Sequence, residues 1–139
     1  MIGEAHHYGI TVSDLEESVA FYRDTLGMDE LDQIGFDDEA FSRFVDVEDV
    51  DVDIVFLDAG GCSIELLEYE NGGGNANEGV SNDTIGASHF CLAVDDVDQQ
   101  YEELSDSVEF VSEPQTLENG AQVVYLYDPD GNTVELLEE

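Results

Sequence analysis

Basic side chains are almost absent from this chain of 139 residues. Its only Lys or Arg residues are Arg23 and Arg43, against 36 Asp and Glu, so the formal net charge is −34. A surface with this charge repels the phosphate groups of nucleic acids and anionic membranes. We therefore expect neither nucleic acid nor a membrane as a partner. A small-molecule substrate with several negative charges needs a metal ion or these two arginines to hold it.

The chain also lacks long apolar runs, and it has only two cysteines. No segment approaches the ~20 apolar residues of a membrane-spanning helix, and residues 1–10 do not resemble a signal peptide. These absences predict a cytoplasmic location. Two cysteines are too few for a disulfide framework. Because Cys62 and Cys91 each lie in an apolar, strand-like run, we expect two free, buried thiols.

The chain does contain enough apolar side chains for a folded core. Hydrophobic residues make up 42% of it, and the acidic residues are dispersed among them. A folded protein with such a surface is typical of a very salty cytoplasm, where screening over about 3 Å at 1 M salt suppresses the repulsion between carboxylates. We therefore predict a halophilic protein whose melting temperature falls as KCl is removed. Full stability at low salt contradicts this interpretation.

The sequence repeats itself in two halves. Residues 7–16 read HYGITVSDLE where residues 89–98 read HFCLAVDDVD, and residues 63–68 read SIELLE where residues 133–138 read TVELLE. Each half thus begins with a His-led strand and ends with a Glu-bearing strand. The Gly- and Asn-rich segment 71–83 has the composition of a linker. We therefore predict two modules, 1–70 and 84–139, within one domain of residues 1–139.

The spacing of apolar residues predicts the same elements in both modules. In the first we expect strands near 6–12, 28–35, 51–58 and 61–69, and a helix capped by Ser13 and ended by Gly27. In the second we expect strands near 88–94, 108–112, 121–127 and 132–138, and a helix over 96–105. Residues 37–47 suit a short helix, although a strand remains open. The fold class is therefore α+β, with two tandem βαβββ modules.

Two histidines and two glutamates occupy equivalent positions in the repeat. His7 matches His89, and Glu65 matches Glu135. Alternate strand residues share a face, so each Glu points away from its apolar neighbours in sequence. If these strands line one cavity, two imidazoles and two carboxylates meet there, which suits Zn, Ni, Mn, Fe or Co. The register selects His7 over His6, which we expect to point outward.

These segments resemble the vicinal oxygen chelate superfamily, which includes glyoxalase I, methylmalonyl-CoA epimerase, extradiol dioxygenases, fosfomycin-resistance enzymes and bleomycin-resistance proteins. The residues that carry the resemblance are 7–28, 63–69, 89–98 and 123–138. It implies that curved mixed sheets of the two modules enclose a metal site, usually in a homodimer. It also implies that His7, Glu65, His89 and Glu135 are the metal ligands.

The presence of four ligands distinguishes between members of this family. Bleomycin-binding members lack the ligands, and extradiol dioxygenases generally use two His and one Glu. A carboxylate at Glu65 therefore favours a metal-dependent lyase or isomerase of glyoxalase type, with Zn, Ni, Co or Mn preferred to Fe. By resemblance, Glu135 abstracts a proton next to a metal-bound carbonyl, and Glu65 is the second choice for this role. An extradiol-type dioxygenase and a non-catalytic, antibiotic-binding protein of the same fold remain alternatives.

Arg43 is the candidate for binding an anionic group of the substrate. It lies in segment 37–47, which in related chains covers the mouth of the cavity, whereas we expect Arg23 to be structural. A CoA thioester carries several phosphate charges and needs more cations than this chain has. We therefore expect a small or differently tagged dicarbonyl, thiol adduct or hydroxy acid as substrate.

Overall fold

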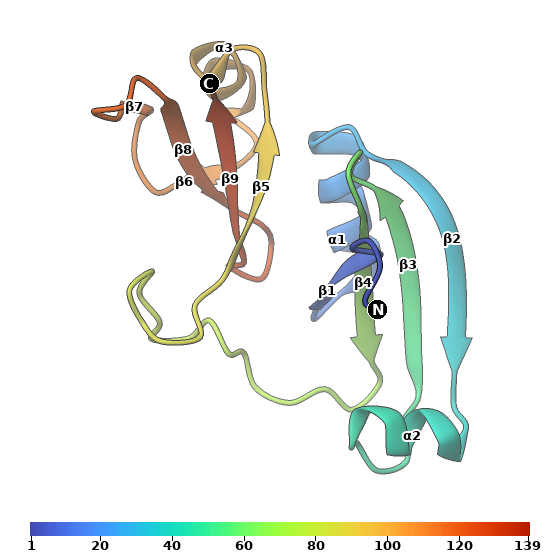
Figure 1. Cartoon of the computed structure of the whole chain (residues 1–139). Helices are drawn as coiled ribbons and strands as arrows, with labels where there is room; N and C mark the ends of the chain where they lie inside the picture. The colour runs from blue at the N-terminus through green and yellow to red at the C-terminus, as the bar shows by residue number, and fades with distance from the viewer. The chain divides into compact units, whose positions relative to one another are not determined.

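The computed structural model describes residues 1–139 and divides them into two compact units, Met1–Gly74 and Asn75–Glu139. Each unit is a βαβββ module with a mixed sheet, which confirms the predicted α+β class (Figure 1). The division falls at Gly74, so most of the predicted linker 71–83 groups with the second module rather than lying between the two.

Hydrogen bonds explain why this segment belongs to the second module. The Asn75 side-chain amide donates to the Asp130 carbonyl at 2.9 Å, and the Asn77 amide donates to Asn132 Oδ1 at 2.9 Å. Both acceptors lie within residues 128–132, between the last two strands of the chain. A linker composition thus forms an ordered loop because its asparagines find backbone and side-chain acceptors.

The sheet of the first module has the strand order β1-β4-β3-β2. Its strands are β1 (His7–Thr11), β2 (Asp29–Phe36), β3 (Val52–Asp58) and β4 (Ser63–Tyr69). β1 runs parallel to β4, while the other neighbours are antiparallel. The long strands β2 and β3 curve along their length (Figure 1).

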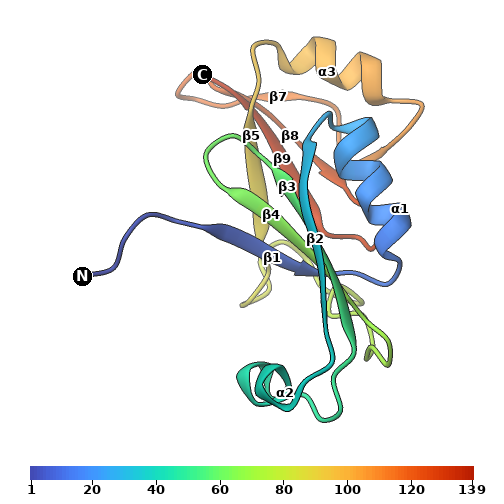
Figure 2. The same ribbon diagram turned by 90° about the vertical axis from the view of Figure 1, so that its right-hand side faces the viewer.

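One helical segment covers one face of this sheet. It begins as α1 (Leu15–Val19) and widens into a π-helix, η1 (Ala20–Thr25), and Figure 2 shows it against the strands. The N-cap is Asp14 and not the predicted Ser13, because the Asp14 carboxylate accepts the Glu17 N–H at 3.1 Å. Gly27 follows the segment with a φ of 83°, as its predicted role at the helix end requires.

The ambiguous segment 37–47 forms a helix, α2 (Glu39–Val45), beyond one end of the sheet (Figure 2). Phe36 and Phe41 stack with their ring centroids 4.8 Å apart. Together with Val45 they pack on a buried cluster that includes Ile54 and Leu67. The helix is therefore held by aromatic packing on the sheet face opposite to α1.

The second module repeats this arrangement with shorter strands. Its elements are β5 (His89–Ala93), α3 (Val97–Leu104), β6 (Glu109–Phe110), β7 (Gln115–Thr116), β8 (Gln122–Tyr127) and β9 (Thr133–Glu138). The strand order is β5-β9-β8-β6, β7 also pairs with β8, and β5 runs parallel to β9. The sequence did not predict β7, since a pair of residues carries no periodicity. None of the helices in the structure is long and apolar enough to cross a membrane.

In each sheet one face packs against a helix, α1 or α3, and one glutamate of the last strand points to the other face. In β4, Ile64 and Leu66 are fully buried, and Glu65 between them points to the second face. In β9, Val134 and Leu136 are buried in the same way on either side of Glu135. The alternation predicted for both glutamates is therefore present.

Candidate metal centre

The first module brings His7 and Glu65 together. They lie on the neighbouring parallel strands β1 and β4, where Glu65 pairs with Gly9, two residues beyond His7. The distance from His7 Nε2 to Glu65 Oε1 is 3.5 Å, and the Glu65 side chain is 16% exposed. The sequence repeat thus identified two side chains that meet on one face of the sheet.

The second module brings His89 and Glu135 together in the same register. Glu135 pairs with Cys91, two residues beyond His89, on the parallel strands β5 and β9. The distance from His89 Nε2 to Glu135 Oε2 is 3.0 Å, and the Glu135 side chain is 17% exposed. Both modules therefore present one imidazole nitrogen and one carboxylate oxygen in contact.

The geometry of each pair fits two ligands of one metal ion. Two donor atoms bound to an ion at about 2.1 Å, at an angle of about 90° to 109°, lie about 3.0 to 3.4 Å apart. The two His–Glu distances, 3.5 and 3.0 Å, are close to this range. Nitrogen and carboxylate donors suit zinc and its first-row neighbours.

The other ring nitrogen of each histidine also has a partner, as is usual for metal-binding histidines. His89 Nδ1 lies 3.4 Å from the Tyr125 hydroxyl, and His7 Nδ1 lies 2.7 Å from His6 Nδ1. His6 is exposed, as an outward position requires, but its ring also contacts that of His7. The strand begins at His7, so the strand alternation does not extend to His6, which turns back toward its neighbour.

The thiol of Cys91 lies beside Glu135 and is exposed, so the prediction of a buried thiol is wrong. The reason is that Cys91 lies on the polar face of its sheet, two residues from His89. Partial burial raises the pKa of this thiol, and the charge of Glu135 and a hydrogen bond to it raise the pKa further. Cys91 therefore remains a protonated donor to Glu135. Cys62, which we also expected to be buried, is half-buried between β3 and β4.

The two pairs differ in their neighbours. Across the antiparallel partner strand, Glu65 faces Phe56, whereas Glu135 faces Tyr125. On the parallel side, Glu65 pairs with Gly9, where an added Cβ would lie 3.1 Å from Glu65 Oε1. Partial burial raises the pKa of Tyr125, and the charge of Glu135 adds to this, so its hydroxyl keeps its proton. Glu65 has a phenol nearby as well, since partial burial raises the pKa of Tyr69 and the charge of Glu65 adds to this. The thiol of Cys91 is therefore the neighbour that distinguishes the second pair.

Each module by itself provides one pair. No set of three or more His, Cys, Asp or Glu side chains in the structure is arranged as a metal site. A complete ligand set of three or four protein groups therefore needs more than either pair alone provides.

Both arginines are occupied by carboxylates. Arg23 donates to Asp24 at 2.8 Å and to Glu30 at 3.2 Å, which raises the pKa of Arg23 and lowers that of Asp24. Arg43, the predicted substrate-binding residue, is 80% exposed on α2 and pairs with Glu39 at 2.9 Å. Arg43 contacts neither member of a His–Glu pair through any ion pair in the structure.

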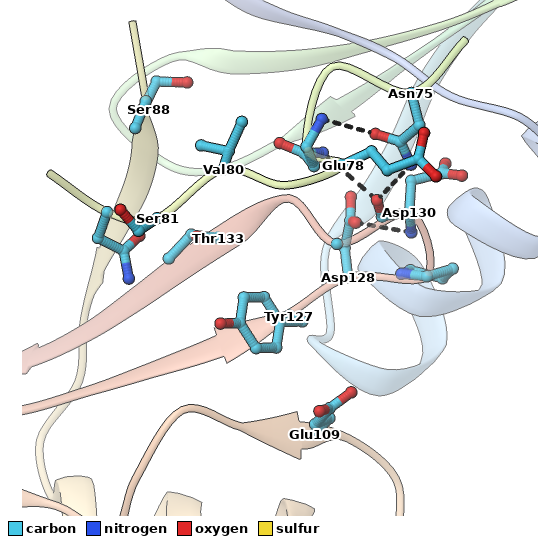
Figure 3. A pocket seen from close by; sticks show the side chains of 15 residues that line it. Asn75, Glu78, Val80, Ser81, Ser88, Glu109, Tyr127, Asp128, Asp130 and Thr133 are labelled. Carbon is cyan, nitrogen blue, oxygen red and sulfur yellow. Dashed lines mark hydrogen bonds between the residues drawn. The ribbon is translucent and has the colours of Figure 1, made fainter. Parts of the chain in front are cut away.

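The second module also contains a polar pocket of about 700 Å³, between the loop of residues 75–88 and the strands β8 and β9. Figure 3 shows Tyr127 and Thr133 on its wall, with Glu109 below and Ser88 opposite. Thr133 is the register partner of His89, but neither His89 nor Glu135 lines the pocket. Its lining contains no Lys, Arg or His.

Comparison with known proteins identifies the family of this chain. The chain belongs to the glyoxalase/bleomycin resistance protein/dioxygenase superfamily, whose family model matches residues 4–136. It is similar to the ethylmalonyl-CoA/methylmalonyl-CoA epimerase of Cereibacter sphaeroides, with 31% identity over 95% of this chain and 93% of the relative. It is also similar to a probable lactoylglutathione lyase of Synechocystis sp., with 27% identity over 95% of this chain and 92% of the relative.

Among solved structures, a glyoxalase family protein from Bacillus cereus has the same fold. The two structures superpose with a TM-score of 0.87 at 20% identity, over 100% of this chain and 95% of the other. This likeness confirms the fold, and the family model over residues 4–136 confirms the predicted superfamily. Because its relatives include both an epimerase and a probable lyase, placement in the glyoxalase I branch stays a prediction.

The sequence did not single out Tyr125, His6 or Cys91 as neighbours of the pairs. A period of two along β8 contains the signal for Tyr125, since it places this residue opposite Glu135. The signal for Cys91 is its position two residues after His89 on the same strand. No comparable signal exists for His6, which lies outside the strand.

Proposed function

We propose that this protein is a metal-dependent lyase or isomerase of glyoxalase type. The observation that carries the proposal is the recurrence of one His–Glu pair, in the same strand register, in both modules. In this proposal His7, Glu65, His89 and Glu135 together hold one divalent ion, Zn, Ni, Co or Mn rather than Fe. The ligands come from one chain or from two chains of the homodimer that the family resemblance implies.

The two carboxylates have the chemistry that proton transfer needs. When bound, the ion supplies Lewis-acid polarisation of a substrate carbonyl. Glu135 takes the proton from the carbon next to that carbonyl, and Glu65 is the second candidate, which returns a proton on the other side. The Cys91 thiol and the Tyr125 ring flank Glu135 and orient it for this step.

The charge of the chain defines the substrate class. Both arginines pair with neighbouring carboxylates, and the polar pocket of the second module has no cation in its lining. We therefore propose a small vicinal-oxygen substrate, such as a dicarbonyl–thiol adduct, whose remaining part is neutral or positively charged. The predicted role of Arg43 stands only if an anionic group displaces Glu39.

The second candidate is an epimerase of acyl-CoA substrates. It is favoured by the 31% identity to the Cereibacter sphaeroides epimerase. The nucleotide phosphates of CoA, however, need cations, and the two arginines are already paired. Proton abstraction next to a carbonyl is common to both candidates, so the same residues serve in each.

The test is metal content followed by a substrate screen in molar KCl. The chain is refolded in KCl, loaded with Zn, Ni, Co or Mn, and assayed with α-ketoaldehyde–thiol adducts and with an acyl-CoA. We expect one metal ion to bind for each complete set of the four proposed ligands. We also expect turnover of the α-ketoaldehyde–thiol adducts. Turnover of the acyl-CoA alone selects the epimerase, and turnover of a catechol with bound Fe selects the dioxygenase. Absence of a bound metal rejects the proposal and favours the non-catalytic binding protein.

A further inference from the structure

We propose that Tyr125 is a positioning residue that holds His89 with its Nε2 atom directed at the metal position. The inference deepens the metal centre described above and rests on the proposed function for the identity of that centre. Tyr125 itself contacts His89 and is not assigned a proton-transfer role.

The contact involves both the ring and the hydroxyl of Tyr125. The hydroxyl lies 3.4 Å from His89 Nδ1, and the two ring centroids are 5.1 Å apart with an angle of 40° between the planes. At the same time His89 Nε2 lies 3.0 Å from Glu135. Both nitrogens of the imidazole therefore have a neighbour, the carboxylate on one side and the tyrosine hydroxyl on the other.

A hydroxyl is suited to this position because it serves either tautomer of the imidazole. Without a metal, Nε2–H donates to Glu135, so Nδ1 accepts a hydrogen bond from the Tyr125 O–H. Ligation needs the lone pair of Nε2, so the proton moves to Nδ1 and donates to the Tyr125 oxygen. A hydroxyl can donate and accept, whereas a carbonyl or carboxylate oxygen supports only the second state.

The first module shows that the tyrosine is not a requirement of the fold. Its equivalent position is Phe56, whose ring lies edge-on to His7 with the centroids 5.5 Å apart and which has no hydroxyl. There His6 contacts His7 Nδ1 instead. Each ligand histidine thus has a different neighbour at Nδ1, and only that of His89 is part of the sheet.

The experiment compares Tyr125→Phe with Tyr127→Phe. Tyr127 lies two residues along the same strand, so its variant removes a hydroxyl without changing the neighbour of His89 Nδ1. The imidazole nitrogens of His89 are observed by two-dimensional ¹H–¹⁵N NMR in the metal-free protein and during titration with Zn. The dissociation constant of Zn is measured by competition with a chelator.

We expect Tyr125→Phe to shift the Nδ1 resonance of metal-free His89 and to weaken Zn binding about 10-fold. That is the low end of the effect of such outer partners, as suits a 3.4 Å contact. Tyr127→Phe should change neither quantity. An unchanged Nδ1 resonance in Tyr125→Phe overturns the inference even if the protein binds no metal. Absence of Zn binding by the unmodified chain rejects the proposed function instead.

Discussion

The two His–Glu pairs share a register but have different surroundings. His89 and Glu135 are 3.0 Å apart, and a thiol and a phenol flank them. His7 and Glu65 are 3.5 Å apart, and the strand partners of Glu65 are a glycine and a phenylalanine. The sequence repeat therefore gives both modules the same His and Glu side chains. The residues that surround these side chains differ between the modules.

This difference suggests a division of labour between the modules. A carboxylate with a hydrogen-bonding neighbour is held in one orientation, as a proton acceptor at a defined substrate atom must be. At the place that Cys91 takes beside Glu135, Glu65 has Gly9, which has no side chain to donate a hydrogen bond. The comparison thus supports Glu135 as the principal base and Glu65 as the second carboxylate.

The largest expected effect is on turnover in Glu135→Gln. An amide oxygen can bind a metal but cannot take up a proton, so we expect a loss of at least about 100-fold in kcat with metal content largely retained. Glu65→Gln should lose less, because its carboxylate is the second candidate. Both variants are assayed with their metal content measured on the same samples.

The outcome of this pair of variants can reverse the assignment. Unchanged turnover in Glu135→Gln rejects Glu135 as the base. A larger loss in Glu65→Gln than in Glu135→Gln transfers the principal role to the first module. Loss of metal in either variant means that the charge of that carboxylate, and not only its oxygen, is needed for binding.

The next effect concerns the contribution of each histidine to metal-linked stability. A ligand at 100 times its dissociation constant stabilises the folded protein by about 2.7 kcal/mol. If His7→Ala or His89→Ala raises this constant 100-fold, the stabilisation at the same metal concentration falls to about 0.4 kcal/mol. Urea unfolding at constant KCl, with and without Zn, measures both values.

These two alanine variants decide whether one site uses both pairs. We expect both to lose most of the stabilisation, because neither module alone groups three ligands. Full stabilisation in His7→Ala with loss in His89→Ala would show that the second module binds the metal without the first.

Comparison of the sequence with the structure shows which structural features could be predicted from the sequence. Period-two alternation placed Glu65 and Glu135 on the correct face, because buried neighbours force the choice. The recurrence of the same element order in both modules, and the matching of His7 with His89 and of Glu65 with Glu135, followed from the internal repeat. The cap at Asp14 was missed because adjacent Ser and Asp side chains are both good helix caps, and only backbone geometry selects one.

Features that depend on residues distant in the sequence could not be predicted from the sequence. The loop of residues 75–88 is ordered by acceptors about 55 positions away in the sequence, which its Gly and Asn content does not indicate. The exposure of Cys91 depends on which face the α3 helix covers. The pairing of Arg43 with Glu39 appears only once residues 39–45 are helical.

The smallest expected effect tests the close approach of Glu65 to Gly9. In Gly9→Ala the new Cβ would lie 3.1 Å from Glu65 Oε1, so the carboxylate must move by a few tenths of an ångström. Because binding sites tolerate displacements of up to about 0.5 Å, we expect Zn binding to weaken by no more than about fivefold. The matched change in the second module, Cys91→Ala, removes only a weak thiol donor beside Glu135 and should weaken Zn binding about twofold. Chelator competition measures both constants under the same KCl concentration. A larger loss in Cys91→Ala than in Gly9→Ala would mean that hydrogen bonding at Glu135 matters more for the metal than space at Glu65.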